Sequence, residues 1–107
     1  LLSIHINAAG NSAHRGSIIF FQPDSTESKS LALLIQEELS KIGPHHTRSP
    51  LAGRVYYILR NSEATAVLLE LGFITNQEEK KLLSDPQYQQ AIARAITAAV
   101  IRHFTHK

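Results

Sequence analysis

The chain has 107 residues, 43% of them hydrophobic, and a formal net charge of +2 at pH 7. This length allows one domain with one core and is too short for two. The small charge, without a basic run interleaved with aromatic residues, argues against nucleic-acid binding. The absence of cysteine excludes disulfides, thiolate chemistry and cysteine-based zinc sites. No apolar run approaches the roughly 20 residues that a membrane span needs.

The first segment alternates between apolar and polar residues. This period predicts a β-strand over residues 1–7, with Ser3, His5 and Asn7 on its polar face. A polar loop over 8–15 separates it from a second predicted strand over 17–22. Because this loop is too short for a parallel crossover, we expect the two strands to be antiparallel or not adjacent.

Residues 24–44 carry the signals of a helix. Asp24 and Glu27 have capping-box spacing, apolar residues follow at helical intervals, and Gly43 with Pro44 predicts the end. Two adjacent histidines, His45 and His46, lie in the loop beyond. Neighbouring loop side chains more often point apart than converge, so a shared metal site is disfavoured there.

The second half completes the expected sheet and its cover. Residues 54–60 predict a third strand and 66–71 a fourth, joined by a loop too short for a parallel adjacent pair. A short helix over 76–83 follows, capped by Thr75 or Asn76. A final helix starts at Asp85 and Pro86, and its apolar stripe to Phe104 should pack on the sheet. The predicted fold class is α/β, with a mixed sheet of at least four strands covered by helices.

One charged residue, Glu70, ends the apolar fourth strand. Charged side chains are rarely buried unless they are paired or bind a metal, so Glu70 either pairs with one of the eleven Lys and Arg residues or has a catalytic or ligand role. His5 occupies a similar place near the end of the first strand, so both side chains could face one cleft. An imidazole and a carboxylate suit metal-assisted hydrolysis. A lone strand histidine is nevertheless more often structural, and zinc takes about four ligands.

Several motifs, in order and spacing, resemble those of the zinc-dependent N-acetylmuramoyl-L-alanine amidases. They are Ser3–Asn7, the strand after Gly16, Tyr57–Arg60, Val67–Asn76 and Gln90–Ile96. The resemblance implies a zinc cofactor with His5 as ligand and Glu70 as the catalytic residue. It implies hydrolysis of the amide between N-acetylmuramic acid and L-alanine in peptidoglycan, in the periplasm or outside the cell at the wall. By that mechanism zinc polarises the carbonyl and lowers the pKa of its bound water, whose proton Glu70 passes to the leaving amine.

Two further residues are candidates for substrate binding. Arg60 either binds a substrate carboxylate or forms an ion pair with Glu63 or another acid. Asn7 orients His5, contacts the substrate, or ends its strand through a side-chain hydrogen bond.

The chain also departs from the family's pattern. The other two zinc ligands of the family, a His in a Gly-His-Gly-Gly type turn and a Glu on the next helix, lie upstream of the Ser-Ile-His motif, where this chain begins. The chain also lacks methionine. We therefore expect residues 1–107 to be the C-terminal two-thirds of an amidase catalytic domain, inactive alone and prone to oligomerise through an uncovered sheet edge. The alternative is a non-catalytic peptidoglycan-binding or regulatory module on the amidase scaffold. Another α/β hydrolase is excluded because no G-x-S-x-G elbow or cysteine nucleophile occurs.

Overall fold

The computed structural model describes residues 1–105; His106, one of the histidines of the sequence, lies outside the described residues. Within residues 1–105, four strands and four helices follow one another without a regular alternation. In order they are β1 (Leu2–Asn7), β2 (Ile18–Phe21), α1 (Thr26–Ser40), β3 (Leu51–Ala52), α2 (Tyr57–Arg60), β4 (Val67–Phe73), α3 (Gln77–Leu83) and α4 (Pro86–Thr105).

The strands form one sheet in the order β1-β4-β2-β3. β4 pairs parallel with β1 and antiparallel with β2, and β2 pairs parallel with β3. The sheet is therefore mixed, as predicted, and β1 and β2 are not adjacent, which agrees with the short loop between them. β4 lies inside the sheet, whereas β1 is an edge strand.

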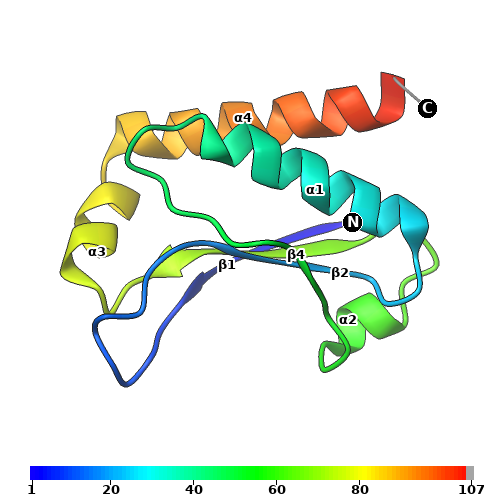
Figure 1. Ribbon diagram of the computed structural model, residues 1–107, viewed down its shortest axis with the longest axis horizontal. Helices are drawn as coiled ribbons and strands as arrows, with labels where there is room; N and C mark the ends of the chain where they lie inside the picture. Colours follow the sequence, from blue (N-terminus) through cyan, green and yellow to red (C-terminus); the bar gives the residue numbers. More distant parts are fainter. Residues whose placement is uncertain (106–107) are drawn as a thin grey trace.

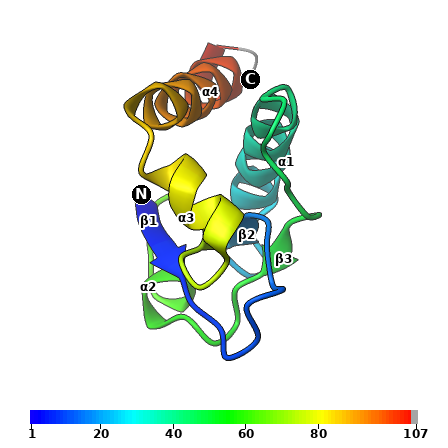
Figure 2. The same cartoon turned by 90° about the vertical axis from the view of Figure 1, so that its left-hand side faces the viewer.

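Helices cover both faces of the sheet. α1 and α4 lie together over one face and the short α2 lies under the other (Figure 1, Figure 2). On β4, Val67 and Leu69 face the core shared with α1 and α4, whereas Leu68 packs against Leu59 of α2. Because β4 is buried on both faces, its sequence is a nearly continuous apolar run, and Glu70 is the only charged residue in it.

The helix starts follow the predicted capping signals with one exception. Asn76 caps α3, and the Asp85 carboxylate accepts a hydrogen bond from the first turn of α4. The cap of α1 is Ser25, whose Oγ accepts from the backbone N–H of Ser28, and the prediction of Asp24 was one residue early. Asp24 has φ of 61°, a left-handed conformation that Asp tolerates in a turn before a helix.

The prediction of a third strand over residues 54–60 is wrong. The strand β3 lies earlier, and the chain turns at Gly53 into the helical turn α2. A Cβ at Gly53 would lie 2.3 Å from Leu59 Cδ1, so only glycine lets the chain double back this closely. Leu59 is fully buried and Val55 is 84% exposed, which is the pattern of one helical turn packed on the sheet and not of a strand.

The prediction for the last helix also needs correction. α4 packs mainly on α1, and the end of its apolar stripe is open, since Phe104 is 57% exposed. Its small residues, including Ala95 and Ala99, are buried in the core shared by α1, α4 and one face of the sheet. Within residues 1–105, no helix is both long and apolar enough to cross a membrane.

Candidate functional site

The register of the sheet brings His5 and Glu70 side by side. They are direct partners in the parallel pairing of β1 with β4, so their side chains leave the same face of the sheet. That face is the one covered by α2, because Leu68, two residues before Glu70, packs under Leu59. On the other side of Glu70 its partner is Ile18 of β2. A carboxylate is thus flanked by an imidazole and an apolar side chain in one row across the sheet.

One oxygen of the Glu70 carboxyl group, Oε2, is buried without a hydrogen-bond partner among the described residues. No Lys or Arg of this described part forms an ion pair with Glu70, so the structural alternative of a salt bridge finds no support. Burial raises the pKa of Glu70, and the nearby His5 lowers it by a smaller amount. A carboxyl with a raised pKa and a free oxygen is suited to exchange protons.

The imidazole of His5 is exposed and has one local partner. Its Nε2 lies 2.7 Å from the Ser3 hydroxyl, two residues earlier on the same face of β1. When that hydroxyl accepts the Nε2 proton, Nδ1 keeps its lone pair for a metal ion or a substrate proton. Ser3 therefore orients His5, a task that the sequence reading did not assign to it.

Tyr56 and Phe20 form an apolar wall beside the Glu70 carboxyl. Their rings lie 4.9 Å apart, centroid to centroid, and both pack on the α2 side of the sheet. Burial raises the pKa of Tyr56, and the negative charge of Glu70 adds to this effect. This effect of its charge places the Glu70 carboxyl near Tyr56.

A bulge in β4 shapes the other side of the site. β4 uses three residues to pass from Glu70 to Phe73 where β1 uses two to pass from His5 to Asn7. The extra residue returns Phe73 to the same face as Glu70. The Phe73 ring is contacted by the His14 ring and by the Arg48 guanidinium, each 5.8 Å from its centroid.

The two candidate substrate-binding residues, Asn7 and Arg60, are not part of the His5–Glu70 pair. The Asn7 side-chain carbonyl accepts from the backbone N–H of Ala8 at 2.8 Å, so Asn7 ends its strand; the structure does not test its further roles. Arg60 is exposed in α2, not at the end of a strand, and makes no ion pair with Glu63 within the described residues. Its role in substrate binding stays a prediction.

The adjacent histidines do not converge. His45 is buried between the Tyr88 hydroxyl at 2.6 Å and the Ser17 hydroxyl at 2.9 Å, whereas His46 is exposed. Burial lowers the pKa of His45. His45 is therefore a hydrogen-bonded core residue that connects the loop after α1 to β2 and α4.

The sequence reading missed the part that Glu79 plays. The spacing from Asn76 to Glu79 predicts a capping box, in which the Glu reaches back to its own helix start. In the structure Glu79 is 5% exposed, and its Oε1 accepts from the backbone N–H groups of Gly16 and Phe73, each at 2.9 Å. This carboxylate joins the loop before β2 to the end of β4, next to the bulge.

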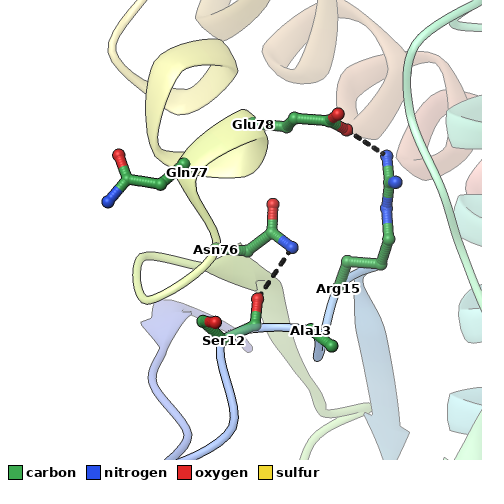
Figure 3. Close-up of a pocket in the computed structure, with 6 residues that line it drawn as sticks. All are labelled: Ser12, Ala13, Arg15, Asn76, Gln77 and Glu78. Carbon is green, nitrogen blue, oxygen red and sulfur yellow. Dashed lines mark hydrogen bonds and ion pairs between the residues drawn. The ribbon is translucent and has the colours of Figure 1, made fainter.

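A cavity of about 400 Å³ lies between the loop after β1 and the start of α3 (Figure 3). The Arg15–Glu78 ion pair (3.1 Å) and the hydrogen bond from Asn76 Nδ2 to the Ser12 carbonyl (3.0 Å) cross it. None of the candidate site residues lines it. These contacts brace the loop against α3.

A metal centre is incomplete in this part of the chain. Residues 1–105 contain no group of three or more His, Asp or Glu side chains able to hold a metal ion. His5 fits one position of a zinc site, but three protein ligands are needed even for an open catalytic site.

Comparison with known proteins places this geometry in a family. A family model described as N-acetylmuramoyl-L-alanine amidase matches residues 1–102. The germination-specific N-acetylmuramoyl-L-alanine amidase of Bacillus subtilis is 32% identical over 99% of this chain and 45% of that protein. LytH of Staphylococcus aureus, named a probable cell wall amidase, is 29% identical over 97% of this chain and 35% of its own length.

Solved structures agree with this match. The N-acetylmuramoyl-L-alanine amidase from Clostridium difficile 630 superposes with a TM-score of 0.92 at 28% identity, over 100% of this chain and 58% of that one. The CwlD amidase from Clostridioides difficile, in complex with the GerS lipoprotein, superposes with a TM-score of 0.88 at 34% identity. The match covers 99% of this chain and 54% of that one. This chain spans about half the length of these relatives. By its sequence and its α/β fold, the chain belongs to the N-acetylmuramoyl-L-alanine amidase family.

Proposed function

We propose that the protein containing this chain hydrolyses the amide between N-acetylmuramic acid and L-alanine of the peptidoglycan stem peptide. The observation that carries the proposal is the pairing of His5 with Glu70, whose buried Oε2 has no partner within residues 1–105. A desolvated, unpaired carboxylate is costly to a fold, which favours a role in chemistry. Membership of the amidase family supplies the reaction class.

Glu70 is the proton-transfer residue in this proposal. Its raised pKa brings the carboxyl closer to the operating pH, where one group can both accept and return a proton. Glu70 takes a proton from the attacking water and passes it to the nitrogen of the leaving L-alanine. The apolar wall of Tyr56 and Phe20 limits water around the carboxylate. Arg60 and Asn7 remain proposed substrate contacts.

Zinc is the cofactor we propose, with His5 as one ligand. Further donors have to come from beyond the described residues, because these hold no set of three. Accordingly, we propose that the 107 residues are the C-terminal part of a catalytic domain and are inactive alone. The site of action that fits this substrate is the cell wall, as the name of the related cell wall amidase also suggests.

The test is amidase activity of the natural protein that contains this chain, supplied with zinc. Intact peptidoglycan is the substrate, and release of the L-alanine amino group is the readout. Glu70→Gln removes the base at constant shape, so we expect turnover to fall at least about 100-fold, the lower range for general acid–base catalysis, while zinc content by mass spectrometry is unchanged. Glu63→Gln, at an exposed loop carboxylate, is the matched control and should keep full turnover.

Full activity of the Glu70→Gln protein would refute the proton-transfer role. Loss of zinc in that variant would make Glu70 a metal ligand instead. Binding of the wild-type protein to peptidoglycan without release of amino groups would support the non-catalytic wall-binding module.

A further inference from the structure

Arg48 is a cation held in a defined place without an acidic partner. Its guanidinium lies over the Phe73 ring, 5.8 Å from the centroid, and its Nη2 donates to the Arg15 carbonyl at 2.8 Å. These two contacts fix the group between the loop before β2 and the end of β4. Arginine carries five N–H donors, so most remain available for a ligand.

No carboxylate of the described chain neutralises this cation. Every ion pair within residues 1–105 involves Arg15, Lys41, Arg102 or His103, and Arg48 is exposed to solvent. Arg102 shows the contrast, since its guanidinium contacts both Glu37 and Glu38. A guanidinium that is positioned but unpaired is suited to bind an anion from outside, most strongly a carboxylate in bidentate geometry.

The location of Arg48 links it to the proposed reaction centre. The β4 bulge returns Phe73 to the face of Glu70, three residues along the same strand. At about 3.3 Å per residue, the Cα atoms of these two residues are separated by no more than roughly 10 Å. An extended peptide covers a similar distance in two to three residues. The Arg48 guanidinium lies a further 5.8 Å from the Phe73 ring centroid, so a bound stem peptide reaches from Glu70 to Arg48 within a few residues.

We propose that Arg48 binds a free carboxylate of the stem peptide, two residues from the scissile amide on the leaving-group side. This assignment rests on the proposed amidase function. A carboxyl group at this place in a peptide is either a free carboxylate or, when it is amidated, an uncharged carboxamide. The Arg48 guanidinium distinguishes these two forms because only the carboxylate forms a charged bidentate pair. Arg48 thereby makes the enzyme selective for the unamidated stem peptide.

The competing role for Arg48 is structural, in which the side chain only joins two loops. The two roles predict different ratios of kcat/KM for two substrates, muramoyl-L-alanyl-D-glutamate and its α-carboxamide. Because both values are measured on the same sample, their ratio does not depend on how much of the protein is folded. Loss of a loop contact lowers both values together, whereas loss of the carboxylate contact lowers only the first.

The experiment measures this ratio for the natural protein containing the chain, loaded with zinc, and for its variants. We expect the wild type to prefer the free carboxylate roughly 10- to 100-fold, the range for a hydrogen bond to a charged group. Arg48→Gln should bring the ratio close to one, and Arg48→Lys should give an intermediate value. Arg94→Gln, at an exposed arginine on α4, is the matched control and should keep the wild-type ratio.

Each other outcome overturns a specific statement. A wild-type protein that cleaves both substrates equally well refutes the role of Arg48 and leaves the amidase function standing. A preference that survives in Arg48→Gln, or that disappears in Arg60→Gln instead, also refutes it. A wild type that cleaves neither these substrates nor intact peptidoglycan refutes the amidase function and this assignment with it.

Discussion

Replacing Glu79 by alanine should unfold much of the structure around the site. The buried carboxylate accepts two backbone hydrogen bonds, from Gly16 and Phe73, each at 2.9 Å. A hydrogen bond to a charged group contributes about 1.5–3 kcal/mol, and alanine leaves both N–H donors unsatisfied. The expected loss in the free energy of unfolding is therefore about 3–6 kcal/mol, a large part of the total of about 5–15 kcal/mol for a domain.

Urea unfolding followed by circular dichroism measures this loss. With an m-value of about 1.5 kcal/mol/M, a loss of about 4 kcal/mol lowers the midpoint by roughly 2.7 M. Glu79→Gln keeps a carbonyl acceptor at the same place, so it should lose less than the alanine variant does. The control is Glu78→Ala on the same helix, where the side chain is 73% exposed and its ion pair contributes at most about 1 kcal/mol.

Equal midpoints for Glu79→Ala and Glu78→Ala would refute this reasoning. They would mean that water replaces the carboxylate at the two backbone N–H groups without a measurable penalty. A midpoint shift with a changed m-value would instead point to a change in the compactness of the unfolded state.

Two further predictions concern pH and self-association. Burial lowers the pKa of His45 from the ordinary histidine value of about 6.5. Near and below that pH the unfolded state therefore binds more protons than the folded state, so stability falls as the pH drops from about 7.5 to 5. Urea midpoints measured across that pH range test this prediction, and His45→Gln should make stability depend less on pH. If stability depends on pH as steeply in the variant, another group is responsible. Ile4 and Ile6 are 52% and 51% exposed on the edge strand β1, so we expect the 107-residue chain to self-associate. Sedimentation should show concentration-dependent species, reduced by the double change Ile4→Thr and Ile6→Thr, whereas a monomer at all concentrations would contradict the expectation.

The sequence by itself determined the elements whose signals are local. The period-2 pattern of β1, the apolar run of β4 and the caps at Asn76 and Asp85 each depend on neighbouring residues and were predicted correctly. Short loops also restricted which strands are parallel neighbours, and from this the mixed sheet followed. The family resemblance also rested on local motifs, and these are spread from Ser3 to Ile96 along the chain.

Residues 54–60 show where local signals fail. Their β-branched and aromatic composition predicts a strand, but Leu59 has to reach the core under β4, and Gly53 permits the close turn that puts it there. Tertiary burial of one side chain decided the structure of this segment against its propensity.

The site itself depends on contacts between distant segments. That His5 and Glu70 both matter was predicted from two separate motifs, but only the register of β1 with β4 makes them neighbours. The brace of Glu79 and the position of Arg48 over Phe73 have no sequence signal, because both depend on the bulge in β4. A bulge shifts the face of every later side chain, so the residues beyond it meet partners that only the folded chain brings together.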